Sequence, residues 1–120
     1  MTLIRSTGLV LALTAGCAGT PDATDTSTAI SPGMGYEEVF VMLGDYDTER
    51  EFRGDVTALQ FCSGSSKEAE YVMVWFIGNQ VEGVTRYDQE IPDDERCGWF
   101  FKEIDWTQAP DIIKSELFID

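Results

Sequence analysis

The residues of this chain that could do chemistry are its carboxylates, its serines and three cysteines, because the sequence contains no histidine. A general base would have to be an aspartate or glutamate tuned by burial, and a nucleophile would have to be Ser65, Ser66 or a cysteine. Neighbouring carboxylates such as Asp93 and Asp94 are weak evidence for a catalytic pair, because the chain contains 22 acidic residues. The sequence also lacks a glycine-rich phosphate loop. It therefore predicts that the protein is not an enzyme and uses no cofactor.

Metal binding is not predicted either. Calcium loops place oxygen ligands at alternating positions around a central glycine and end in a bidentate glutamate. The stretch GDYDTEREF has the alternation at Asp45, Asp47 and Glu49, but it lacks both the central glycine and the distal glutamate. A zinc site without histidine would need carboxylates as ligands, which is uncommon for structural zinc. We expect no metal site.

The first cysteine, Cys17, follows a short apolar stretch near the start of the sequence. Arg5 precedes the run GLVLALTAG, which is too short for a permanent transmembrane helix of about 20 residues and is typical of a secretory signal. The ending LTAGC resembles a bacterial lipobox, with Thr14 where leucine is commonest. The resemblance implies a signal peptide over residues 1–16 and a lipidated Cys17 that anchors the protein in a membrane. An ordinary secretory signal with a free Cys17 is the alternative.

The residue after Cys17 is Ala18 and not aspartate. By analogy with the sorting of enterobacterial lipoproteins, this favours the outer membrane, with the domain facing the periplasm. Residues 17–31 are small, polar and rich in threonine and aspartate, so we expect the lipidated cysteine to be followed by a flexible tether. Residues 32–120 then form a single domain.

The other two cysteines are expected to pair. If Cys17 carries lipid, Cys62 and Cys97 remain in an exported protein, where disulfides form and persist. Two separate buried thiols are the alternative. On the chain-entropy estimate, closing a loop of this length would stabilise the domain by roughly 3–4 kcal/mol.

The formal net charge of −14 excludes one class of partner. Nucleic-acid binding needs a basic stripe that neutralises phosphates, and this chain has only 8 lysines and arginines against 22 acidic residues. Anionic lipid headgroups are unfavourable neighbours for the same reason. The expected contact with the membrane is therefore through the lipid anchor alone.

The periodicity predicts a short helix followed by three strands. In SPGMGYEEVFVMLGD, apolar residues recur at helical spacing, with Gly35 as a modest N-cap and Gly44 just beyond the end. These apolar residues are Tyr36, Val39, Phe40 and Leu43. After an acidic connector, VTALQFC, EYVMVWFI and VEGVTRYD are typical of strands. The second is apolar on both faces and should be central, and the turn at residues 78–79 makes the third its hairpin partner.

The aromatic stretch CGWFFKEIDWTQAP follows these strands. Its periodicity does not decide between helix and strand over residues 97–106. A bond from Cys97 to Cys62 would tie it to the end of the first strand, so that its aromatic side chains cover the sheet. The predicted fold class is therefore α+β: a short N-terminal helix packed on a three-stranded antiparallel sheet, with a C-terminal aromatic segment held by a disulfide.

The helix and hairpin sequences also resemble a known family. SPGMGYEEVFVMLG, TALQFC and YVMVWFIGNQVEGVTRY together resemble the SmpA/OmlA family of small bacterial lipoproteins, also called BamE, over about residues 31–88. The matching residues are Gly33, Met34, Val39, Leu43 and Gly44 in the helix and Phe76, Gly78 and Val81 in the hairpin. Gly35 replaces the usual threonine or serine. LQFC together with C…FF…W…AP resembles a disulfide-containing subgroup with this fold. The resemblance implies a helix packed on a three-stranded sheet.

Two functions from different classes follow. The first is a membrane-anchored scaffold or accessory subunit of an envelope complex, in which Trp75, Trp99 and Trp106 are candidate contacts for a protein partner or else core residues. The alternative is a periplasmic inhibitor-like or small-ligand-binding module, although no small-molecule substrate is indicated. An exposed aromatic patch would favour protein binding, and an enclosed apolar cavity would favour a small ligand.

Overall fold

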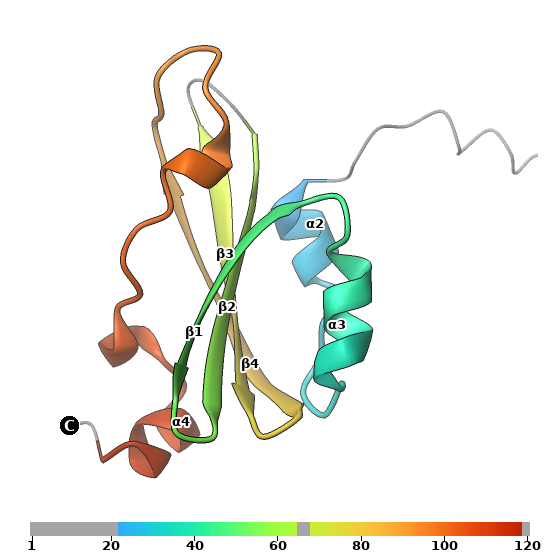
Figure 1. The fold of residues 1–120 in the computed structure, drawn as a ribbon, viewed down its shortest axis with the longest axis vertical. Helices are drawn as coiled ribbons and strands as arrows, with labels where there is room; N and C mark the ends of the chain where they lie inside the picture. The colour runs from blue at the N-terminus through green and yellow to red at the C-terminus, as the bar shows by residue number, and fades with distance from the viewer. Residues whose placement is uncertain (1–21, 65–67, 119–120) are drawn as a thin grey trace, which may run out of the picture.

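The computed structural model describes residues 22–64 and 68–118, and in this part of the chain a four-stranded antiparallel sheet is covered on both faces. The elements in chain order are α2 (Ala23–Ser27), α3 (Tyr36–Met42), β1 (Asp47–Arg53), β2 (Val56–Ser63), β3 (Ala69–Ile77), β4 (Gln80–Gln89), two short 3-10 turns (Cys97–Trp99 and Trp106–Gln108) and α4 (Asp111–Glu116). Figure 1 shows α2 and α3 on one side of the sheet and the C-terminal segment, residues 97–118, on the other. The predicted signal peptide and Cys17 lie outside the described residues.

The sheet has the order β1-β2-β3-β4, so each described strand pairs with the next one along the chain. The prediction of three strands is wrong, because the acidic stretch expected to be a connector forms β1. Nearly all of β1 is exposed, and Phe52 is its only apolar side chain, so it has no apolar alternation. Gly54, with φ of +58°, makes the tight turn that pairs Arg53 with Val56 and returns the chain along β2.

The other three strands are those that the sequence predicts. β3 pairs with β2 on one side and with β4 on the other, so it is an interior strand. Its side chains are buried on both faces: Val72, Val74 and Phe76 point into one core, and Met73 and Trp75 into the other. The turn between β3 and β4 contains Gly78 with φ of +59°, as the hairpin prediction requires.

The first core lies between the sheet and α2 and α3. Val39 of α3 and its C-cap residue Leu43 are buried against Phe76 and its neighbours, which confirms the predicted helix. Phe40, expected on the same apolar face, is instead 42% exposed. The chain before α3 is fixed to β4, because the amide of Gly33 donates to the carbonyl oxygen of Val81 at 2.9 Å. This pairing sets where α3 lies on the sheet.

The prediction that residues 17–31 form a flexible tether is wrong for its described part, residues 22–31. Residues 23–27 form α2, whose Ala23 is fully buried in the first core together with Ile30. The amide of Ala23 also donates to the hydroxyl of Ser63 at 2.7 Å. Composition did not reveal this helix, because an alanine, a single isoleucine and three hydrogen bonds to the sheet hold so short an element. The described structure therefore contains a helix before the one that was predicted.

The second core lies between the opposite face of the sheet and the C-terminal segment. Ile104, Trp106 and Ile113 are buried against Trp75 and its neighbours, as the prediction that this segment covers the sheet requires. The backbone is neither a continuous helix nor a strand over residues 97–106: it is extended between two 3-10 turns. Pro110 then precedes the first residue of α4. No helix in the described ranges is long and apolar enough to cross a membrane.

Candidate functional site

The predicted disulfide between Cys62 and Cys97 is present. It joins the end of β2 to the first 3-10 turn, with 6.1 Å between the two Cα atoms. The Tyr71 hydroxyl donates to the carbonyl oxygen of Cys97 at 2.8 Å, which holds the same turn a second time. Asp47 of β1 lies beside the two sulfur atoms, but its carboxylate is paired with the guanidinium of Arg96. This end of the sheet is therefore a structural junction between β1, β2 and the C-terminal segment.

The three candidate tryptophans do not share one surface. Trp75 is fully buried and Trp106 nearly so, and their rings meet edge to face with centroids 5.5 Å apart. The guanidinium carbon of Arg53 lies 4.5 Å from the centroid of the Trp106 ring and covers it from outside. Trp75 and Trp106 are therefore core residues, and the hypothesis that they contact a partner is wrong for this conformation. Trp99 is 70% exposed and is the one tryptophan of the three that a partner could reach.

A hydrogen-bonded network fixes the C-terminal segment to the middle of the sheet. The Tyr87 hydroxyl donates to Oε1 of Gln60 at 2.9 Å and accepts from the amide of Lys102 at 3.0 Å. The buried amide nitrogen of Gln60 in turn donates to the carbonyl oxygen of Lys102 at 2.9 Å. Burial raises the pKa of Tyr87 to about 12, which keeps its hydroxyl protonated and able to donate. Both ends of the buried Gln60 amide are thus hydrogen-bonded within the fold.

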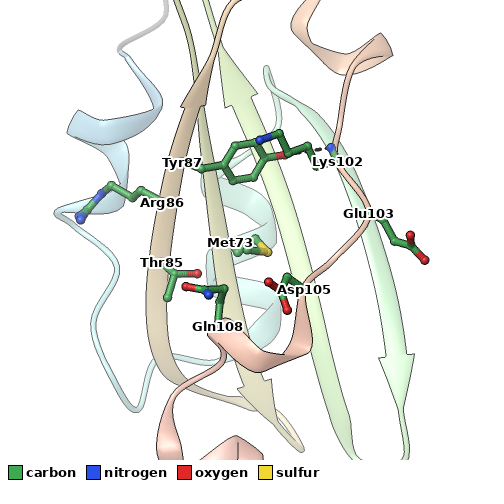
Figure 2. A pocket seen from close by; sticks show the side chains of 8 residues that line it. All are labelled: Met73, Thr85, Arg86, Tyr87, Lys102, Glu103, Asp105 and Gln108. Atoms are coloured by element: carbon green, nitrogen blue, oxygen red, sulfur yellow. Dashed lines mark hydrogen bonds between the residues drawn. The ribbon is translucent and has the colours of Figure 1, made fainter.

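A cavity of about 200 Å³ lies beside this network, between β4 and the C-terminal segment. Figure 2 shows its lining: Met73, Thr85, Arg86, Tyr87, Lys102, Glu103, Asp105 and Gln108. In that view the side chains of Arg86 and Glu103 point away from the space between the others. Asp105 Oδ1 accepts from the amide and the hydroxyl of Thr107 at 3.0 and 2.6 Å, and these bonds lower its pKa.

Several polar groups of this cavity are engaged in hydrogen bonds with residues outside its lining. Thr85 accepts from the indole nitrogen of Trp75 at 2.9 Å, and Arg86 donates to the hydroxyl of Ser27 on the other side of the sheet at 3.0 Å. The cavity is open and mixed in polarity, unlike the enclosed apolar pocket that a small-ligand module would need. It offers little support for the small-ligand alternative.

An exposed patch of a different kind lies where β1 meets α3. We call Tyr36, Phe40, Arg50 and Phe52 the aromatic–arginine patch. The rings of Tyr36 and Phe40 are stacked with centroids 5.8 Å apart, and the guanidinium carbon of Arg50 lies 5.8 Å from the Phe40 centroid and 5.7 Å from that of Phe52. Arg50 also donates to the hydroxyl of Tyr36. Phe40 and Phe52 are 42% and 59% exposed, so two large rings face solvent around a fixed cation.

The patch is anchored to the core through Tyr36, whose ring meets that of Phe76 edge-on with centroids 4.9 Å apart. Arg50 and Phe52 alternate along β1 and therefore lie on the same face of the sheet as α3. The sequence prediction missed the patch because it treated β1 as a connector. The alternation of Arg50 and Phe52 next to a glycine turn was the signal that could have revealed it.

Comparisons of the chain with protein-family models, with curated proteins and with solved structures find no match.

Proposed function

We propose that this protein is a lipid-anchored lipoprotein of the bacterial envelope that binds another protein through the aromatic–arginine patch, as a small scaffold or accessory subunit. The observation that carries the binding part is the patch itself. Tyrosine, phenylalanine and arginine are enriched at protein–protein interfaces, and tyrosine and arginine are also enriched among the residues that contribute most to binding. Here Phe40, Arg50 and Phe52 are exposed and Tyr36 is half-buried. The four side chains hold one another in place, so they would lose little conformational entropy when a partner binds.

The anchoring part is supported by the sequence ending at Cys17 and by the disulfide. LTAGC resembles a lipobox, and disulfides are typical of proteins that reach an oxidising compartment. The sequence resemblance to the SmpA/OmlA lipoproteins agrees with the same location. We propose the outer membrane, with the domain in the periplasm.

Mass spectrometry of the protein extracted from membranes tests the anchor. We expect the mature chain to begin at an acylated Cys17, and we expect the variant Cys17→Ser to lose the modification and leave the membrane fraction. A mature chain that begins elsewhere, or an unmodified Cys17, contradicts the anchor.

Site-specific photocrosslinking in intact envelopes tests the binding surface. A photoreactive residue in place of Phe52 should form a defined crosslinked species. The matched control replaces Ile112 of α4, which is 53% exposed but lies on the opposite side of the sheet. Adding Arg50→Ala should weaken the Phe52 crosslink and leave the Ile112 background unchanged. Equal crosslinking at both positions would contradict the proposal.

A further inference from the structure

We infer that the free edge of β1 binds an extended, cationic segment of the partner, which adds a fifth strand to the sheet. This inference rests on the proposed protein-binding function and names the chemistry of the segment that is bound. β1 is the outermost strand of the sheet and pairs with β2 alone. In an antiparallel pair every second residue turns its N–H and C=O toward the neighbouring strand, so the other residues of β1 direct theirs outward.

The two edges of the sheet differ in how they are covered. At the β4 edge the first two residues of the strand are covered, because Gly33 and Met34 exchange backbone hydrogen bonds with Val81 and Gly35 forms a bridge with Gln80. Within residues 22–64 and 68–118, no segment other than β2 forms hydrogen bonds with the backbone of β1. The β1 edge therefore presents an open row of donors and acceptors over a strand of seven residues, which is the geometry that strand addition uses.

One side of this edge is acidic. A groove of about 230 Å³ lies here, lined by three carboxylates and one cation together with Ile104: Glu49, Arg50 and Glu51 of β1 and Glu103 of the C-terminal segment. All three carboxylates are exposed, and none of them has an ion-pair partner within the described part of the chain. A lysine or arginine side chain from a strand added to β1 would meet them directly.

The acidic groove continues toward the disulfide. Glu49 also lines a second groove of about 280 Å³, in which Trp99 and Phe101 lie. The exposed face of Trp99 could accept a cation over its ring. The carboxylate of Asp47 in this second groove is already paired with Arg96, so the unpaired charge is concentrated at Glu49 and Glu51.

The other side of the edge carries the aromatic–arginine patch. Side chains of an added strand alternate between the two faces of the sheet, so one set would meet the carboxylates and the other set would meet Arg50 and Phe52. The segment that fits both faces has lysine or arginine at every second position and apolar residues between them. Neither face alone specifies this alternation.

A second copy of this chain fits the edge less well. In the antiparallel register that pairs all of β1 with itself, Arg50 would face Arg50 and Glu49 would face Glu51, and like charges placed opposite one another are destabilising. Opposite charges would meet only at the two ends of the strand, where Asp47 would face Arg53, and Asp47 is already paired with Arg96. The net charge of −14 adds repulsion between two copies. The charges on β1 thus oppose pairing with itself and favour a segment of opposite charge.

The test is a titration of the full chain, purified in detergent, with a synthetic peptide as long as β1 that alternates lysine and valine. We expect binding that weakens as salt is added and that slows hydrogen exchange at the outward amides of β1. The variant Glu49→Lys with Glu51→Lys should weaken binding at least about tenfold. The control Asp88→Lys with Glu90→Lys makes the same change of charge at exposed positions near the opposite edge and should leave the affinity unchanged.

Two altered peptides separate strand addition from simple charge attraction. N-methylation of the backbone amides that would face β1 should abolish binding while the charge is kept, and replacing lysine by glutamate should abolish it as well. Equal binding of the N-methylated or the glutamate peptide would overturn the inference. So would slowed exchange at β1 that depends on protein concentration without peptide, because the occupant would then be a second copy. If no peptide binds but Phe52 still crosslinks in envelopes, the inference fails and the proposed function stands.

Discussion

Replacing Trp106 with alanine should lower the free energy of unfolding by about 4–5 kcal/mol. The Trp106 side chain is buried in the second core, against the ring of Trp75 on one side and under the guanidinium of Arg53 on the other. Removing about 150 Å² of buried apolar area at about 25 cal/mol per Å² gives roughly 4 kcal/mol, and the loss of the aromatic contact adds about 1 kcal/mol. Measured losses for buried tryptophans span about 3–5 kcal/mol.

Urea unfolding followed by circular dichroism measures this loss without depending on tryptophan fluorescence. The matched control is Trp99→Ala, which removes the same side chain from an exposed position in the same segment and should change the stability by no more than about 0.5 kcal/mol. If Trp106→Ala leaves too little folded protein, Trp106→Phe should still cost more than Trp99→Ala. Equal, small losses at both positions would show that the C-terminal segment does not cover the sheet, and the second core would be wrong.

The remaining predictions concern the disulfide, Tyr87 and α4. Replacing Cys62 and Cys97 by alanine should cost about 4 kcal/mol in urea titrations, because the bond spans 35 residues; a loss under about 1 kcal/mol would mean that packing alone holds the segment. The Tyr87 pKa is raised from 10.0 to about 12, so its stabilising contribution is full below pH 10 and is lost as pH rises toward 12. Tyr87→Phe should reduce the loss of unfolding free energy between pH 10 and 12, and an unchanged dependence on pH would show that Tyr87 is not the group responsible. Gly83→Ala would place a methyl carbon 2.6 Å from the ring of Pro110, the N-cap residue of α4, so we expect faster hydrogen exchange in α4. Unchanged exchange would show that the Pro110 ring can move aside without disturbing the helix.

The sequence predicted those parts of the fold in which apolar residues follow a regular period. β3 is apolar on both faces and lies inside the sheet, and the helix from Tyr36 buries Val39 and Leu43 as its spacing requires. The pairing of Cys62 with Cys97 followed from the number of cysteines once Cys17 was assigned to lipid. These predictions depend on local pattern or on counting, which a single sequence supplies.

The sequence did not predict the elements whose conformation is set by their neighbours. β1 is a strand because the chain reverses at Gly54, so that β1 and β2 pair, although the residues of β1 are mostly charged and exposed. α2 is a helix that docks through Ala23 and a hydrogen bond to Ser63, contacts made far away in the sequence. The candidate binding surface depends on β1, so it could not be placed before β1 was known to be a strand.

The disulfide also gives the chain a covalent ring. Cys62 and Cys97 enclose β3, β4 and the exposed residues 92–94 that follow them, while α2, α3 and β1 lie outside. A protease that cuts the backbone once after β4 would leave both fragments joined, and their strands would still be paired. Separating them would require a reductant, because a second cut inside the ring would only release the intervening peptide and leave Cys62 bonded to Cys97. A nick in the exposed connection at residues 92–94 would therefore change the apparent size of the protein only after reduction.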